Sequence, residues 1–168
     1  MTDLPYRPCV GISLFNRQGQ VFLGHRIPPP PGDHREESAT RLWQMPQGGI
    51  DKGEAALDAA RRELFEETGI TSADLLGETE DWLHYDLPLE LQGKALKGKY
   101  KGQKMKWFAF RFTGPESEIA PANPGPGLTP EFNDWMWADL SSVAELVVPF
   151  KRPVYQRVVD AFAKYAGT

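Results

Sequence analysis

The stretch that decides the fold is GGIDKGEAALDAARRELFEETGI, residues 48–70. Asp51, followed three residues later by Glu54, fits a capping box and predicts a helix start, although Ser or Thr is the usual first residue. Thr68 and Gly69 predict the end of this helix, because glycine commonly adopts the left-handed conformation that closes a helix. The stretch therefore predicts a glycine-containing turn that leads into a helix.

This helix is expected to carry an apolar arc and an acidic arc. At 100° per residue, one arc collects the apolar side chains Leu57, Ala60, Leu64 and Phe65. An arc roughly opposite collects the carboxylates Glu63, Glu66 and Glu67. Like charges three and four residues apart repel each other, and carboxylates near a helix C-terminus oppose its dipole. A solvated charged face, partly neutralised by Arg61 and Arg62, is the simple interpretation, and it has to accept both unfavourable effects.

Divalent cations would remove both effects. Mg²⁺ prefers oxygen ligands and is often held by a few carboxylates together with the phosphates of a substrate. Ions held by these three carboxylates would bridge phosphate oxygens, neutralise the charge that develops on them and activate a water. The glycines before the helix let the backbone approach the same place. The pattern thus predicts a metal-dependent phosphate site.

Composition limits the class of protein. With 168 residues, 40% of them hydrophobic and 25% charged, the chain is typical of a soluble globular protein, and we expect one domain over residues 1–168. A net charge of −4 argues against the broad basic surface of a protein that coats nucleic acid, so no DNA-binding patch is expected. The single cysteine, Cys9, excludes an intramolecular disulfide and a cysteine-based zinc site. Without a signal-peptide pattern or a run of membrane length, the expected location is cytoplasmic and no membrane contact is expected.

The rest of the chain predicts a mixture of strands and helices. Strands are expected at 9–15, 21–26, 42–47, 79–87 and 103–112, and exposed loops at 28–41, 88–102 and 114–130. A short helix is expected within 141–148 and an amphipathic one at 151–165, with Val154, Val158, Phe162 and Tyr165 on one face. Mixed strands with two or three helices indicate an α/β sandwich.

The stretch 48–70 resembles the Nudix box. Gly48, Glu54 and the run RELFEETGI at 62–70 match the box at every defined position. The resemblance implies a Nudix α/β/α sandwich with a mixed central sheet, and Mg²⁺- or Mn²⁺-dependent cleavage of a nucleoside diphosphate linked to a group X. It also implies a structural salt bridge between Glu54 and Arg62. The metal ligands that it implies are the carbonyl of Gly48 and the carboxylates of Glu63, Glu66 and Glu67. One of these glutamates could instead act as the base through a water, and the motif does not say which.

Four stretches outside the box resemble the bacterial RNA pyrophosphohydrolases and the related dinucleoside polyphosphate hydrolases. They are YRPCVGISLFNRQGQV (6–21), WQMPQGGI (43–50), GQKMKWF (102–108), and TPEF (129–132) followed by PFKRPVYQRV (149–158). This implies removal of phosphate or pyrophosphate from 5′-phosphorylated RNA, or, as the alternative, hydrolysis of a dinucleoside polyphosphate such as diadenosine tetraphosphate. A catalytically silent nucleotide- or RNA-binding module is disfavoured by the intact glutamates, and an ADP-ribose or 8-oxo-dGTP hydrolase by the flanking stretches.

The same resemblance adds site residues. It implies that Glu131 is a further metal ligand, that Tyr85 lies near the nucleotide, and that Phe150 and Lys151 sandwich and contact a base; stacking of this kind tolerates any base. Taken alone, Glu131 would be an ordinary strand-edge residue, and Tyr85 and Phe150 would more often be core aromatics. Candidates for contacts to phosphate or to the RNA 5′ end are Arg7, Arg26, Gln103 and Lys104, each of which would more often be a solvated surface residue. The loops at 28–41 and 93–101 are longer than in the bacterial pattern, which leaves the preferred substrate open.

Overall fold

The computed structural model describes residues 4–27, 43–92, 98–121 and 130–167, so the predicted loop at 28–41 and parts of the two later loops lie outside the described residues. The strands are β1 (Tyr6–Phe15), β2 (Val21–Arg26), β3 (Trp43–Gln44), β4 (Gln47–Gly49), β5 (Ala73–Glu78), β6 (Leu83–Asp86), β7 (Gly102–Phe112) and β8 (Phe132–Ala138). The α-helices are α1 (Ala56–Thr68), α2 (Val143–Leu146) and α3 (Arg152–Phe162). Short 3₁₀ turns are η2 (Leu89–Leu91), η4 (Glu116–Glu118), η5 (Leu140–Ser142), η6 (Pro149–Lys151) and η7 (Ala163–Tyr165).

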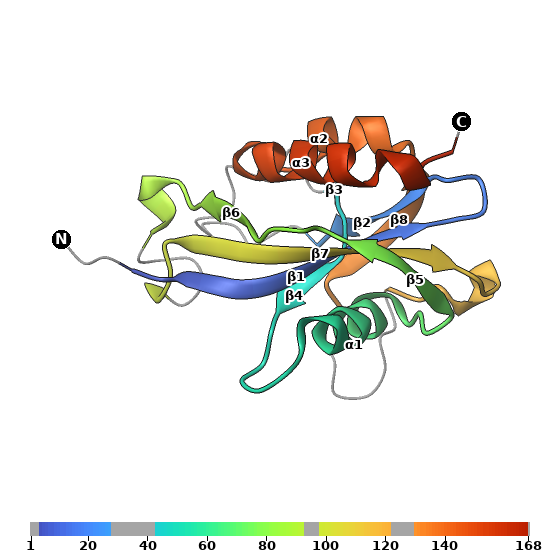
Figure 1. The fold of residues 1–168 in the computed structure, drawn as a ribbon, viewed down its shortest axis with the longest axis horizontal. Helices are drawn as coiled ribbons and strands as arrows, with labels where there is room; N and C mark the ends of the chain where they lie inside the picture. Colours follow the sequence, from blue (N-terminus) through green and yellow to red (C-terminus); the bar gives the residue numbers. More distant parts are fainter. Residues whose placement is uncertain (1–3, 28–42, 93–97, 122–129, 168) are drawn as a thin grey trace.

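The strands form one mixed sheet (Figure 1). Its main path runs β3-β2-β1-β7-β5, while β4 pairs with β1, β6 with β7, and β8 with β2. The two central strands are parallel, in register from Tyr6 beside Gly102 to Phe15 beside Arg111. The other strand pairs of the described chain are antiparallel. The first part of β1 borders β4 and its end borders β2, so this one strand connects the glycine turn to the far end of the sheet.

Helices cover both faces of this sheet, with α1 on one face and α2 and α3 on the other (Figure 1). Successive side chains of a strand point to opposite faces, so β1 supplies Val10 and Ile12 to the core under α1 and Cys9 and Phe15 to the core under α3. We call these the α1-side core and the α3-side core. The arrangement confirms the predicted α/β/α sandwich with a mixed central sheet. Within the described part of the chain, no helix is long and apolar enough to span a membrane.

Several predicted boundaries are wrong. The helix after the glycine turn begins at Ala56, with the extended residue Ala55 as its N-cap, and not next to Asp51. Half of the predicted capping box is present, because a Glu54 carboxylate oxygen accepts the Asp51 backbone N–H at 3.0 Å, but this bond closes the turn that precedes the helix. The strand predicted at 79–87 is confined to β6, and β5 before it was missed.

Two further predicted elements are shorter than expected. The strand predicted at 42–47 is divided into β3 and β4, and the helix predicted within 141–148 is the single turn α2 preceded by η5. The amphipathic helix ends at Phe162, so Tyr165 lies in the following η7 turn. Val154, Val158 and Phe162 are buried as expected.

Candidate active site

Two glycines bring the end of β4 against α1 and β1. A Cβ atom on Gly48 would overlap the carboxylate of Glu63, and one on Gly49 would overlap the guanidinium of Arg7. The same two glycines pair with Val10 and Cys9 of β1. Only glycine leaves room for both side chains, so this backbone, the carboxylate of Glu63 and the guanidinium of Arg7 meet at one place.

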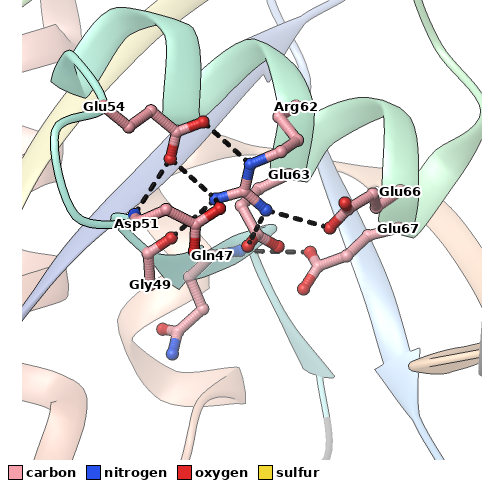
Figure 2. Close-up of polar contacts among 8 residues, drawn as sticks. All are labelled: Gln47, Gly49, Asp51, Glu54, Arg62, Glu63, Glu66 and Glu67. Atoms are coloured by element: carbon pink, nitrogen blue, oxygen red, sulfur yellow. Dashed lines mark hydrogen bonds and ion pairs between the residues drawn. The ribbon is translucent and has the colours of Figure 1, made fainter.

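Arg62 lies between the acidic side chains of the turn and the helix (Figure 2). Its Nε and Nη2 donate to the two Glu54 oxygens, both at 2.9 Å, and Nη1 donates to Glu63 at 2.9 Å and Glu66 at 3.1 Å. Nη2 also donates to the Gly49 carbonyl at 2.9 Å. Hydrogen bonding to Arg62 lowers the pKa of Glu54 to about 2, and that to Glu54 raises the pKa of Arg62 above its usual value. The structure thus contains the ion pair predicted between Glu54 and Arg62, and it ties the turn to the helix.

Glu67 is buried, with 6% of its surface exposed. One carboxylate oxygen accepts the backbone N–H of Gln47 at 3.1 Å. Burial raises the pKa of Glu67 well above its ordinary value, and the negative charges of Glu63 and Glu131 raise it further. Glu67 therefore lies close enough to Glu63 and to Glu131 to be affected by the charge of each.

Glu63 has the same kind of setting. Burial raises its pKa to about 7, against the opposing effect of Arg62, and the charge of Glu66 adds to the rise. The residues around these carboxylates do not fully neutralise them. A positive charge placed among them would stabilise the ionised form of these carboxylates.

The predicted division of α1 into opposite acidic and apolar arcs is wrong for two residues. Glu67 shares the buried side of the helix with Ala60 and Leu64, whereas Phe65 is 45% exposed. Within the described residues, Arg61 bonds to none of these glutamates; it donates to the Ala73 carbonyl at 3.2 Å and lies 5.0 Å from the centre of the Phe110 ring. The buried side of α1 is thus rotated toward the carboxylates.

The donor set suits a hard divalent cation, although the described residues contain no preformed ion site. Among residues 4–27, 43–92, 98–121 and 130–167, no three His, Cys, Asp or Glu side chains are arranged to hold a metal ion. Glu63, Glu66 and Glu67 nevertheless offer carboxylate oxygens within about one helical turn, the ligands that Mg²⁺ prefers. Arg62 takes the place of a cation between two of them. The residues therefore fit a divalent ion by their chemistry, with Arg62 as its competitor.

A polar group on the α3 side faces the same carboxylates. Lys151 is 6% exposed, and burial, with the nearby charge of Arg26, lowers its pKa to about 7. Its Nζ donates to Gln44 Oε1 at 3.3 Å and lies 5.8 Å from the centre of the Tyr85 ring. Weaker effects of Glu67 and Glu131 oppose that pKa shift, which shows that the ammonium lies within reach of their charge.

Three of the predicted substrate contacts are covered by protein in this structure. Tyr85 and Gln103 are buried like Lys151, and the Tyr85 hydroxyl bonds to Gln103 Oε1 at 2.5 Å. The surface position considered for Gln103 is therefore wrong, and Tyr85 takes the alternative place in the α3-side core. Phe150 is partly buried against that core, with its ring centre 5.6 Å from that of Tyr85.

The predicted cationic contacts are divided between two places. Arg7 and Arg26 are partly buried, and their charges act on Glu63 and Lys151 respectively. Lys104 follows Gln103 on β7 and so points to the other side of the strand, where its ammonium lies 5.6 Å from the centre of the Trp82 ring. No contact described by the structure links Lys104 to the carboxylates.

Three residues that contact the predicted site residues were not identified from the sequence. Gln44 and Gln47 lie within WQMPQGGI, and they hold Lys151 through a side chain and Glu67 through a backbone N–H. Trp82, 39% exposed beside Lys104, was missed as well. Their partners are distant in sequence, so only the register of the strands could have identified them.

Comparisons with known proteins identify the family of this chain. The profile of the NUDIX domain matches residues 5–158. The chain is 58% identical over 167 residues to an RNA pyrophosphohydrolase of Azorhizobium caulinodans, covering 99% of this chain and 97% of that protein. It is 59% identical over 160 residues to an RNA pyrophosphohydrolase of Brucella anthropi, covering 95% and 91%.

Solved structures share the fold at low sequence identity. A Caenorhabditis elegans Ap4A hydrolase in a binary complex matches with a TM-score of 0.62 at 20% identity, covering 94% of this chain and 98% of that one. The dihydroneopterin triphosphate pyrophosphohydrolase of Escherichia coli matches with a TM-score of 0.62 at 17% identity, covering 93% and 99%. At this level of identity the likeness concerns the fold alone.

Proposed function

The chain belongs to the Nudix family, and on this premise we propose that it is an RNA pyrophosphohydrolase that converts 5′-triphosphorylated or 5′-diphosphorylated RNA ends to monophosphates. The observation that carries the proposal is 58% identity over 99% of the chain to a relative of that name. The enzyme is a hydrolase of phosphoric anhydride bonds, and members of its family generally need divalent metal ions. The proposed ion in this enzyme is Mg²⁺, with Mn²⁺ able to replace it.

Each part of the site has a proposed role. Glu63, Glu66 and Glu67 are the carboxylate ligands, with Glu131 and the Gly48 carbonyl as further ligands. When bound, a divalent cation neutralises charge on the phosphate oxygens and lowers the pKa of a bound water. Arg62 is a positioning residue, because its bonds to Glu54 and the Gly49 carbonyl fix the turn relative to α1.

The remaining residues would hold the RNA end. Arg7 lies against Gly49, and its guanidinium is proposed to bind phosphate oxygens. Phe150, partly exposed next to Tyr85, offers a ring on which a terminal base can stack. Lys151 is buried with its ammonium 5.8 Å from the centre of the Tyr85 ring, and it is proposed to contact the base. Lys104, beside Trp82, is proposed to contact RNA away from the phosphates.

The experiment that tests the function compares two substrates with purified protein in Mg²⁺. We expect 5′-triphosphorylated RNA to be hydrolysed with a higher kcat/KM than diadenosine tetraphosphate, and the RNA to end as a 5′-monophosphate. A higher kcat/KM for diadenosine tetraphosphate would make the chain a dinucleoside polyphosphate hydrolase. Binding of RNA without turnover of either compound would identify a silent module.

A further inference from the structure

A cavity of about 470 Å³ lies at the turn between β1 and β2, beside the last residues described. Its cationic lining residues are Arg17, Arg111 and Lys164. The hairpin turn and the chain end are joined here by a hydrogen bond from the Gly167 N–H to the Gly19 carbonyl at 3.1 Å. Figure 1 shows the β1–β2 hairpin and the C-terminus together, away from α1 and β4. The cavity therefore belongs to the end of the molecule that the candidate active site does not use.

Among the residues that the structure describes, the lining of this cavity carries positive side chains and no carboxylate. Its other residues are Gln18, Gly19, Tyr165, Ala166 and Gly167, none of them acidic. Asp74 is the cross-strand neighbour of Arg111 but does not line the cavity. The described lining therefore combines three cations with neutral residues, in a chain whose net charge is −4.

One of these cations is held rigidly. Arg111 donates from Nη1 to the Asn16 carbonyl at 2.6 Å and from Nη2 to the Tyr165 carbonyl at 3.5 Å. A guanidinium has five N–H donors, so this one keeps donors for a further acceptor. Arg17 and Lys164 are exposed, and Lys164 lies 5.4 Å from the centre of the Tyr165 ring. A guanidinium held by two hydrogen bonds, with two exposed cations beside it, can bind the oxygens of a phosphate group.

We propose that this cavity binds a backbone phosphate of the RNA substrate, several nucleotides downstream of the 5′ end. The inference rests on the proposed function. Val10, opposite Gly48, and Arg17 are seven residues apart along β1 and its turn, which is about 23 Å at about 3.3 Å per residue. A stacked strand advances about 3.4 Å per nucleotide, so about seven nucleotides reach from the carboxylates to the cavity.

RNA suits this site better than a small anion does. The described lining offers cations and one partly exposed ring but no buried polar side chain that would read a base. Contacts of this kind bind the backbone without regard to sequence, as an enzyme acting on varied RNA ends requires. They also give no advantage to a substrate too short to span the distance, and this difference supplies the test.

The experiment measures steady-state hydrolysis of unstructured 5′-triphosphorylated RNAs of two and of about twelve nucleotides. The variants are Arg17→Gln, Lys164→Gln and the double variant, which leave the bonds of Arg111 intact. Arg157→Gln is the matched control, because Arg157 is exposed on α3 and does not line the cavity. We expect the double variant to raise KM for the long RNA roughly tenfold, and to reduce the log–log salt dependence of its binding by about 1.4, or about 0.7 for each lost contact. The values of kcat and of KM for the dinucleotide should stay unchanged.

Three results would overturn the inference. The first is an equal KM of the wild type for the two RNAs. The second is an increase in KM for the long RNA that is as large in Arg157→Gln as in the double variant. The third is a double variant that loses binding of AMP and keeps binding of the long RNA. The last result would assign the cavity to a free nucleotide. If neither RNA is hydrolysed, the proposed function fails, and fluorescence anisotropy of the long RNA still decides the inference: unchanged affinity in the double variant rejects it, and weakened affinity supports it.

Discussion

Glu66 is the most exposed of the three proposed ligand carboxylates on α1, with 34% of its side chain accessible. Its contact in the described structure is the hydrogen bond from Arg62 at 3.1 Å. Glu66→Gln keeps the size and a hydrogen-bond acceptor, so the fold should survive. Loss of a ligand charge removes several kcal/mol of stabilisation from the transition state, so we expect kcat in saturating Mg²⁺ to fall roughly a hundredfold or more.

Glu80→Gln is the control for this change, because Glu80 is exposed and lies outside the carboxylate group. Circular dichroism and thermal midpoints should match the wild type for both variants. Near-wild-type turnover by Glu66→Gln would show that Glu66 is not a metal ligand.

Glu54 should behave differently, because both its oxygens bond to Arg62 and one also bonds to the turn. We expect Glu54→Gln to lower the thermal midpoint at pH 7 and to reduce kcat much less than Glu66→Gln does. The folded pKa of about 2 lies below the ordinary 4.5, so this stabilisation is complete above pH 4.5 and is lost as the pH falls toward 2. Thermal unfolding at several pH values should therefore show the two proteins converging in acid. A constant difference across this range would contradict the role of the Glu54 charge.

Residue identity alone predicted the candidate carboxylates but not their surroundings. The spacing of Glu63, Glu66 and Glu67 was visible in the sequence, whereas the burial of Glu67 depends on the rotation of α1 against β4. A helical wheel does not specify that rotation when a backbone N–H, such as that of Gln47, is available to donate a hydrogen bond to a buried carboxylate. The same limit applies to Gln103 and Lys151, which are polar residues buried through partners distant in sequence.

At the scale of elements, the end of α1 depends on Gly69. Its φ of +79° is left-handed, and its N–H bonds to the Phe65 carbonyl at 2.8 Å. Gly69→Ala should destabilise the protein by about 1–2 kcal/mol, the cost of this conformation for a residue with a side chain. A Cβ there would also lie 3.3 Å from the Glu118 carbonyl oxygen, which adds a tight contact.

Chemical denaturation of Gly69→Ala, Gly69→Asn and Gly53→Ala separates these causes. Gly53 has a similar φ of +80° with no heavy atom near the added Cβ, so it isolates the backbone cost. Asparagine tolerates the left-handed conformation better than alanine, so Gly69→Asn should lose less stability. Equal stability of Gly69→Ala and the wild type would contradict the capping role.

The η6 turn carries Phe150 at the border of the α3-side core. We expect Phe150→Leu, which keeps an apolar side chain against Tyr85, to fold normally and to lose about 1–3 kcal/mol of stacking with a terminal base. This loss is roughly a tenfold to hundredfold decrease in kcat/KM for triphosphorylated RNA, mostly through KM. Kinetics with the RNA and with inorganic polyphosphate, which has no base, are the measurement. An equal loss for both compounds would mean that Phe150 has only a packing role.

Clear hydrophobic patterns in the sequence predicted most helices and strands, and the strand without such a pattern was not predicted. The apolar runs of β1, β2 and β7 and the amphipathic α3 were expected within a few residues of their observed bounds. β5 was missed because Asp74, Leu75 and Glu78 are all exposed, which leaves no alternation for a pattern to detect. Pairing with β7 stabilises this strand, and such pairing involves residues that are distant in sequence.

At the scale of the molecule, both cores are built on the same strands. β1 and β7 supply side chains to each face, so neither core can lose its packing without disturbing the sheet that supports the other. We therefore predict that the chain unfolds as one cooperative unit, as a single domain should. Calorimetry should give one transition whose calorimetric and van't Hoff enthalpies agree.

A matched pair of core substitutions tests this coupling. Leu64 is buried in the α1-side core and Leu140 in the α3-side core. Leu64→Ala and Leu140→Ala should each lower the free energy of unfolding by about 2–5 kcal/mol, and each should move the whole transition. A second transition in either variant would show that the two faces unfold independently.

The bonds of Arg62 have a consequence for the order in which the enzyme is assembled. A small zinc domain gains its fold from its ion and is unfolded without it. Here a side chain of the same chain already offsets the crowded negative charge of the turn and the helix, so folding at the ribosome does not have to wait for an ion. Loading with the proposed metal would then be a step separate from folding, and a shortage of the ion would leave folded but inactive protein.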